Sequence, residues 1–188
     1  MFFPDSSLRE EFEERIGTGG GYTEPWTLGV VAALLIAKCP SSVLELGTYI
    51  GYSSQWLCHA LATCGGNRLF RGVEIDPLRA KKTRERLARH DFGNVKTDIV
   101  EADTLQFLNN EEPFGYEFAW VDADHDAKRV EKELHLLING GIVAPGGIIC
   151  MHDVDGPFGL DALCEAAGGY VLKFPKLHVA GGLGVIQV

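Results

Sequence analysis

The sequence predicts an α/β protein with a doubly wound, mostly parallel β-sheet. From residue 43 onward, short apolar runs alternate with segments that have helical spacing. Parallel neighbours need a long crossover connection, and each intervening segment is long enough to supply one as a helix. The end of the chain departs from this rhythm, with two β-rich runs and no room for a helix between them. The sequence therefore predicts a parallel sheet with a C-terminal antiparallel hairpin at its edge.

The predicted elements follow one another in a regular order. The N-terminal part is expected to form a short helix over residues 5–15, a glycine-rich loop over 17–22 and a second helix over 25–39. Seven strands are expected at 43–46, 69–75, 97–100, 118–121, 148–151, 170–174 and 184–188. Helices are expected between them at 53–62, 77–90, 104–108, 128–139 and 161–167.

Two of these helices carry recognisable end signals. Asp76 followed by Pro77 is typical of an N-cap and the first helical position. Gly140 and Gly141 follow the helix over 128–139 and are suited to the left-handed backbone that ends many helices. These signals support a helix after the second strand and another after the fourth.

Length and charge indicate one domain that does not bind nucleic acid. A chain of 188 residues is long enough for one full core. We expect a single domain over 1–188, with an N-terminal helix and glycine-rich loop over 1–24 and the core over 25–188. The formal net charge is −9, and no segment gathers enough Lys and Arg to hold a phosphate backbone.

Cysteine usage and hydropathy bear on the expected location of the protein. The sequence has five cysteines, an odd number, and none are spaced as Cys-x-x-Cys. Several lie in apolar runs, where they pack as small hydrophobic side chains, which fits a reducing compartment. The longest apolar run, 28–37, is far shorter than the roughly 20 residues that span a bilayer. We therefore expect no signal peptide, no membrane contact and a cytoplasmic protein.

A glycine-rich turn follows the first predicted strand, at the edge of the sheet where open α/β sheets bind ligands. Between Glu45 and Ser53 the chain places Gly47 and Gly51, which allow the backbone to approach a ligand closely. Ser53 is suited to cap the next helix. Such a turn also occurs without any ligand, so it is informative only together with its neighbours.

Acidic residues end the next two strands. Glu74 ends the second strand 23 positions after Gly51, about where dinucleotide-binding folds place the carboxylate that holds a ribose diol. The alternative is a solvated carboxylate, which the apolar character of the preceding residues disfavours. After the third strand, Ala102 and Asp103 offer a backbone amide and a carboxylate to an adenine edge.

The turn is not that of a nicotinamide dinucleotide site, because tyrosines occupy positions 49 and 52, where that fingerprint requires glycine. It resembles instead the first motif of class I S-adenosylmethionine-dependent methyltransferases. The similarity is to the small O-methyltransferases of the catechol and caffeoyl-CoA type and their bacterial relatives, including the cephalosporin hydroxylase-like group. Four segments carry it, in the order found in that family: 44–53, 73–77, 121–125 and 145–147.

The resemblance implies a Rossmann-like methyltransferase fold and a set of S-adenosylmethionine ligands. By analogy with the family, the methionine part would lie along the turn, the ribose on Glu74 and the adenine near Ala102 and Asp103. General class I enzymes prefer glycine at position 49, whereas the catechol-type branch tolerates a tyrosine there. The residues that the resemblance assigns to the cofactor are Glu45, Gly47, Thr48, Tyr49, Gly51, Ser53, Glu74, Ile75, Ala102, Asp103 and Asp122.

Acids and a histidine follow the fourth and fifth strands. Adjacent parallel strands lie about 4.8 Å apart, so Asp122, His152 and Asp153 are expected to meet at one edge. Carboxylates this close repel one another unless a cation or proton intervenes. In the related enzymes this position binds magnesium through carboxylates and an amide. Here His152 replaces the first acid of the pair, which suits manganese, zinc or nickel better. A metal-free site with an ordinary strand-end histidine is the alternative.

Methyl transfer to a hydroxyl requires a group that removes a proton. His125 lies where the catechol-type relatives place a lysine base, and an imidazole suits that task near neutral pH. Asp124 is the second candidate, and a purely structural role for His125 stays open.

The resemblance thus predicts an S-adenosylmethionine-dependent O-methyltransferase of a small hydroxylated molecule, with Mg²⁺ or another divalent metal as a possible aid. Two alternatives remain. One is a metal-dependent oxygenase on the same fold, in which Asp122, His152 and Asp153 hold iron. The other is a non-catalytic protein that binds the cofactor. The acceptor is not encoded in a readable motif, and the sequence leaves a homodimer possible.

Overall fold

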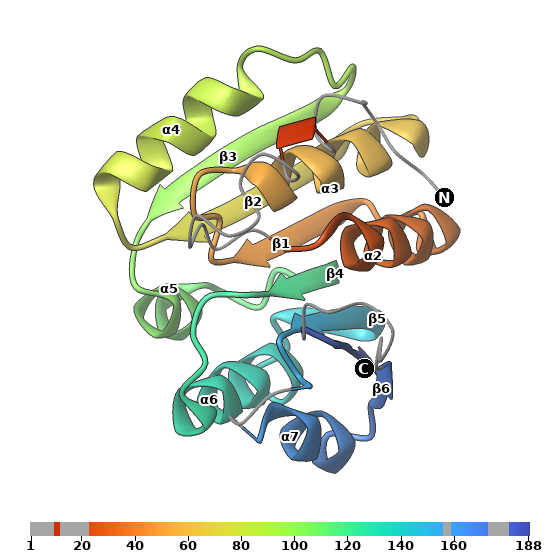
Figure 1. Cartoon of the computed structure of the whole chain (residues 1–188), viewed down its shortest axis with the longest axis vertical. Coiled ribbons are helices and arrows are strands. Elements are labelled where there is room, and N and C mark those ends of the chain that lie inside the picture. Colours follow the sequence, from red (N-terminus) through yellow and green to blue (C-terminus); the bar gives the residue numbers. More distant parts are fainter. Residues whose placement is uncertain (1–9, 12–22, 156–158, 173–180) are drawn as a thin grey trace.

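A mixed sheet with the strand order β3-β2-β1-β4-β5-β7-β6 forms the centre of the molecule (Figure 1). This computed structural model describes residues 10–11, 23–155, 159–172 and 181–188. The strands of the described part are β1 (Ser42–Leu46), β2 (Arg68–Glu74), β3 (Val95–Glu101), β4 (Tyr116–Val121), β5 (Val143–His152), β6 (Tyr170–Leu172) and β7 (Leu183–Gln187).

The strand pairing confirms the predicted α/β class. The strands β1 to β5 pair in parallel, whereas β7 runs antiparallel to both β5 and β6. The C-terminal hairpin therefore closes one edge of the sheet, with β6 as its outer strand. The fifth strand begins at Val143, earlier than the predicted residue 148, and includes Pro145, Gly146 and Gly147.

Helices cover both faces of the sheet, as a doubly wound fold requires (Figure 1). One apolar core joins a face of the sheet to the first three helices, and the second core joins the opposite face to the last three. Val43 belongs to the first core and Leu44 to the second, as the alternation of side chains along a strand dictates. The helices are α2 (Pro25–Lys38), α3 (Tyr52–Thr63), α4 (Pro77–Leu87), α5 (Thr104–Asn110), α6 (Ala127–Ile138) and α7 (Leu160–Ala166).

The predicted helix ends are mostly confirmed. Asp76 caps α4 by accepting hydrogen bonds from the amides of Leu78 and Arg79. The helix ends at Leu87, earlier than the predicted residue 90, because the amides of Arg89 and His90 bond to carbonyls only three residues back and so form a turn. Gly141 adopts the expected left-handed backbone after α6, with φ +70°.

Parts of the predicted N-terminal and C-terminal segments lie outside the described residues. Glu10 and Glu11 are helical, and the rest of the predicted 5–15 helix and the loop over 17–22 are not described. The same holds for residues 173–180, between β6 and β7. Among the described residues, no helix has the length and apolar character needed to span a membrane.

Candidate functional site

The glycine-rich turn after β1 has a backbone that few other residues would allow. Gly47, Tyr49 and Gly51 all have positive φ angles, of 87°, 49° and 83°. A Cβ atom on Gly47 would lie 2.5 Å from the Cα atom of Ala123 and 2.5 Å from the carbonyl oxygen of Asp122. Glycine at position 47 is therefore required for the turn to pack against the loop that follows β4.

Glu74 connects this turn to the end of β2. One of its carboxylate oxygens accepts a hydrogen bond from the amide of Tyr49 at 2.8 Å, and the other accepts one from the amide of Asp76 at 3.0 Å. Each carboxylate oxygen can accept a further hydrogen bond. Glu74, which the sequence predicts to hold a ribose, thus also fixes the shape of the turn.

A cavity of about 160 Å³ opens at these strand ends. It lies where β1, β2 and β4 stop, the position expected of a ligand site in an open α/β sheet. Four of the residues assigned to the cofactor line it, together with the second candidate base, Asp124. The lining residues are Gly47, Val73, Glu74, Ile75, Asp103, Thr104, Ala123, Asp124 and Arg129.

Other residues assigned to the cofactor surround the turn without lining the cavity. The Thr48 side chain is buried, and its hydroxyl lies 3.2 Å from that of Thr83. The amide of Ala102 donates to the carbonyl of Glu74 at 3.0 Å, which joins the ends of β2 and β3. Tyr49, Gly51, Ser53 and Asp122 are likewise outside the lining.

Glu45 lies in the core and also does not line the cavity. Both carboxylate oxygens accept hydrogen bonds, one from the Ser53 hydroxyl and one from the Ser54 hydroxyl, each at 2.5 Å. Complete burial raises the pKa of Glu45 to about 8, despite the two serines, and the negative charges of Asp122 and Glu74 add to the increase. Glu45 is therefore a neutral core group at pH 7 that holds the first turn of α3.

Arg129 is a cavity residue that the sequence did not indicate. Its guanidinium forms ion pairs with Asp103 and Asp124, at 3.3 Å for Asp124. Burial opposes ionisation of Asp103, but hydrogen bonds from the Gln106 amide and the Arg129 side chain outweigh it and lower the pKa of Asp103. The residue at the predicted adenine position is thus an ionised carboxylate, already paired with a cation.

The second group of predicted residues meets next to the cavity, at the ends of β4 and β5. Nδ1 of His152 lies 3.2 Å from a carboxylate oxygen of Asp122 and 3.4 Å from one of Asp153. One ligand atom from each of the three residues can be chosen so that all lie within 4.8 Å of one another. The juxtaposition predicted from adjacent strand ends is present.

Two residues that precede α2 complete this cluster. Nε2 of His152 lies 3.0 Å from a carboxylate oxygen of Glu24, which also accepts a hydrogen bond from Thr27 at 3.1 Å. The Thr23 hydroxyl donates to Asp122 at 2.8 Å. No sequence pattern indicates these contacts, because Glu24 and His152 are 128 positions apart.

His152 therefore has carboxylates at both ring nitrogens. Burial disfavours the charged imidazole, but the negative charge of Asp122 and the hydrogen bonds to Asp122, Asp153 and Glu24 outweigh it and raise the pKa of His152 well above the usual value. Burial also disfavours the charged form of Asp153, but the two neighbouring histidines outweigh it and lower the pKa of that carboxylate. The carboxylates around His152 therefore favour a positive charge at this position, carried by the protonated imidazole or by a bound cation.

The two candidate bases serve different parts of the site. Nε2 of His125 lies 2.6 Å from a carboxylate oxygen of Asp153, so His125 belongs to the acid and histidine cluster. Asp124 accepts a hydrogen bond from the Asp126 amide at 2.9 Å and pairs with Arg129, so it belongs to the cavity. Of the two, only His125 is joined to the residues predicted to bind a metal.

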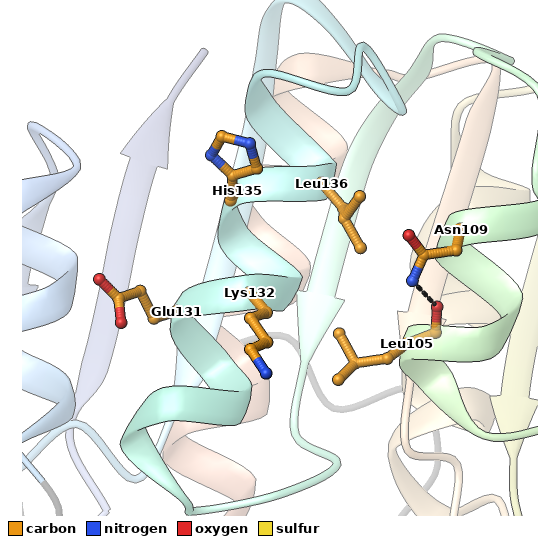
Figure 2. Close-up of a pocket in the computed structure, with 6 residues that line it drawn as sticks. All are labelled: Leu105, Asn109, Glu131, Lys132, His135 and Leu136. Atoms are coloured by element: carbon orange, nitrogen blue, oxygen red, sulfur yellow. Dashed lines mark hydrogen bonds between the residues drawn. The ribbon is translucent and has the colours of Figure 1, made fainter.

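A larger groove, of about 490 Å³, lies between α5 and α6 (Figure 2). It is lined by Leu105, Asn109, Glu131, Lys132, His135 and Leu136. None of the predicted site residues belongs to it, and its only hydrogen bond drawn in Figure 2 joins the Asn109 side chain to the Leu105 carbonyl. The candidate catalytic and ligand-binding side chains therefore lie at the strand ends and not in this groove.

Known proteins share both the sequence pattern and the fold. A family model described as a methyltransferase domain matches residues 44–154, more than half of the chain. The chain is 27% identical over 146 residues to protein-L-isoaspartate O-methyltransferase from Shewanella sp. (strain W3-18-1), a match that covers 76% of this chain and 64% of that protein. The chain thus spans less than two thirds of the length of this curated relative.

Solved structures agree in fold over nearly the whole chain. The O-methyltransferase TomG from Streptomyces achromogenes, in complex with SAM, has a TM-score of 0.74 at 17% identity, covering 98% of this chain and 90% of its own. The O-methyltransferase from Bacillus cereus, in complex with SAH, has a TM-score of 0.73 at 20% identity, covering 98% and 91%. These likenesses confirm the predicted Rossmann-like fold. The match to a methyltransferase domain does not favour the oxygenase alternative. The chain belongs to the methyltransferase-domain family.

Proposed function

We propose that the protein transfers a methyl group from S-adenosylmethionine to an oxygen atom of a small hydroxylated molecule. The observation that carries the proposal is the placement of the cavity with Gly47 and Glu74 directly beside the acid and histidine cluster. Family membership and the SAM and SAH complexes of the related folds support this choice of cofactor.

In this proposal the cavity holds the adenosyl part of the cofactor. Glu74 has free acceptor capacity for the ribose hydroxyls, since each carboxylate oxygen uses one hydrogen bond for a backbone amide. Gly47 has no side chain, so the turn can lie against the backbone of Ala123, and both residues line the cavity. Asp103 and Arg129 present a paired anion and cation at the purine end.

The methyl acceptor would approach from the cluster formed by His125, His152 and Asp153. A hydroxyl becomes a strong nucleophile when it loses its proton, and the sulfonium then releases the methyl group in a direct displacement. His125 is exposed enough to reach an acceptor, with 40% of its side chain accessible, and Asp153 holds its ring. We assign His125 as the base and Asp153 as the residue that orients it.

The donor set of the cluster fits a divalent metal ion. Asp122, Asp153 and Nδ1 of His152 would be its ligands, and Glu24 at Nε2 provides the hydrogen bond that metal-binding histidines usually make through their second nitrogen. A bound ion would favour the ionised form of an acceptor hydroxyl. One imidazole among carboxylates favours manganese, zinc or nickel over magnesium.

Calorimetry with S-adenosylhomocysteine tests the cofactor assignment. We expect the wild-type protein to bind it and Glu74→Gln to bind it at least tenfold more weakly. Glu101→Gln is the matched control, because Glu101 is the register partner of Glu74 on β3 but faces Arg84 instead of the cavity. Absence of binding to the wild-type protein would overturn the proposal.

A methyl-transfer assay tests the acceptor class. Labelled S-adenosylmethionine is offered with a panel of phenols and sugars, and with an isoaspartyl peptide as a separate arm. The proposal expects label in a small hydroxylated acceptor. If label appeared only in the peptide, the acceptor would be a protein carboxylate and not a small hydroxylated molecule.

A further inference from the structure

Two cysteines that follow different helices lie close together near the amino-terminal ends of β1 and β2, whereas the cavity lies at the carboxyl ends of the strands. Cys39 directly follows α2 and is exposed, and Cys64 directly follows α3 and is half-buried. The Cys39 thiol donates to the Cys64 carbonyl at 3.8 Å, and the neighbouring Cys39 side chain contributes to raising the pKa of Cys64. A bond between their sulfur atoms would join the C-terminal ends of α2 and α3.

Arg68 fixes a positive charge beside this pair. One terminal nitrogen of its guanidinium lies 3.4 Å from the Cys39 sulfur and 3.2 Å from the Cys64 carbonyl oxygen. Bonds to the carbonyls of Cys39 at 3.3 Å and Gly65 at 2.6 Å hold the same guanidinium in place. The thiolate is the form of cysteine that reacts with oxidants, and the Cys39 sulfur lies within contact distance of this guanidinium.

The other three thiols lack these features. Cys58, Cys150 and Cys164 are buried in the cores, and burial raises the pKa of each. Burial, followed by the contact with Cys39, also raises the pKa of Cys64. Of the pair, Cys39 is the exposed thiol and the one whose sulfur accepts a hydrogen bond from Arg68, and Cys64 is the more buried partner.

We propose that Cys39 and Cys64 form a redox-active thiol pair, which a hydroperoxide converts to an intramolecular disulfide. The Cys39 thiolate attacks one peroxide oxygen, so that a sulfur–oxygen bond forms, the oxygen–oxygen bond breaks and hydroxide or an alcohol leaves. The Cys64 sulfur then attacks the Cys39 sulfenic acid, and water leaves as the disulfide forms. Two thiols and hydrogen peroxide give one disulfide and two waters, with the sulfurs oxidised and the peroxide oxygens reduced.

The pair is separate from the proposed methyl transfer. Neither cysteine nor Arg68 lines the cavity or belongs to the acid and histidine cluster. A test of the thiol pair is therefore independent of whether the protein binds an adenosyl cofactor.

Mass spectrometry of the full-length protein tests the proposal. The reduced protein is treated with hydrogen peroxide, denatured and alkylated with iodoacetamide, and its peptides are mapped. Before treatment we expect all five cysteines to take up alkyl groups. After treatment we expect loss of alkylation at Cys39 and Cys64 alone, and a linked peptide pair lighter by two hydrogen atoms. Linkage to another cysteine, or disulfide-bonded dimers through Cys39, would overturn the assignment.

Variants separate the roles of the two thiols and of Arg68. In Cys64→Ser, Cys39 should stop at a sulfenic acid that dimedone traps, and in Cys39→Ser, Cys64 should keep its thiol under the same treatment. Arg68→Met should slow the loss of the Cys39 thiol severalfold, whereas Arg89→Met on the surface should not. Equal rates in the wild-type protein and Arg68→Met would contradict the role of the cation. If a variant fails to fold, peptide mapping of the wild-type protein still shows whether the disulfide joins Cys39 and Cys64.

Discussion

Nε2 of His152 lies 3.0 Å from a carboxylate oxygen of Glu24, so a residue just before the first helix of the core contacts the end of β5. With Asp122 at the other ring nitrogen, this contact fixes the plane of the imidazole. The same arrangement serves a protonated histidine between carboxylates or a metal-binding histidine supported by a carboxylate. Metal titration distinguishes these two states.

Replacing Glu24 by Gln should weaken metal binding. The carboxylate that holds the Nε2 proton of His152 is lost, and carboxylates in that role typically account for about 10–100-fold in metal affinity. Calorimetric titration with Mn²⁺ measures the change. Glu112→Gln, at an exposed position, is the control and should bind like the wild-type protein. Equal affinity in Glu24→Gln would remove Glu24 from the metal site.

Glu45 should make the stability of the fold depend on pH. Its pKa is about 8 in the folded state against an ordinary 4.5, so the unfolded chain releases this proton first as pH rises. The stabilisation from the neutral carboxyl is complete below pH 4.5 and is lost as pH rises toward 8. Through this group the free energy of unfolding falls by up to about 5 kcal/mol once the pH is well above 8.

Urea unfolding at several pH values measures this effect. Glu45→Gln keeps a neutral group of the same shape, so its free energy of unfolding should fall less between pH 5 and pH 8 than that of the wild-type protein. Parallel pH profiles for the two proteins would show that Glu45 is ionised in the fold.

Gly47→Ala should be strongly destabilising. The new methyl group would lie 2.5 Å from the Ala123 backbone, at a φ of +87° that disfavours any side chain. Gly93→Ala separates the two causes, because Gly93 also has a positive φ, of +61°, but no heavy atom within 4 Å of the added carbon. We expect a loss of about 1–2 kcal/mol from backbone strain in Gly93→Ala, and a larger loss in Gly47→Ala. Equal losses in urea unfolding would exclude the close approach to Ala123.

His125→Ala should lower kcat with little change in cofactor affinity. A general base typically contributes about 10²–10⁴-fold to the rate, and His125 contacts Asp153 rather than the cavity. Steady-state kinetics with the acceptor found by the panel, together with calorimetry, measure the two effects. His135→Ala, in the α5–α6 groove, is the control. An unchanged kcat in His125→Ala would make its role structural.

The sequence predicted the parts of the site that follow from sheet topology. Asp122 and His152 end neighbouring strands, so the strand order alone brings them together. The turn around Gly47 and the carboxylate of Glu74 are likewise neighbours because β1 pairs with β2. Local patterns were sufficient wherever chain order and strand pairing decide the contact.

Contacts made by helices and by the N-terminal segment could not be predicted in this way. No pattern in the sequence indicated Arg129, but it lines the cavity and pairs with Asp103. Glu24 reaches His152 only because α2 packs beside α3 and brings its N-terminus to the strand ends. The position of such side chains depends on how a helix is rotated and shifted against the sheet, which a single sequence does not specify.

A crystal structure of the protein with bound S-adenosylhomocysteine would show whether the cavity is the cofactor site. We expect the ligand in the cavity at the ends of β1, β2 and β4, with its ribose hydroxyls hydrogen-bonded to Glu74 and its purine beside Asp103. Ligand density in the groove between α5 and α6, or a ribose that makes no contact with Glu74, would contradict it.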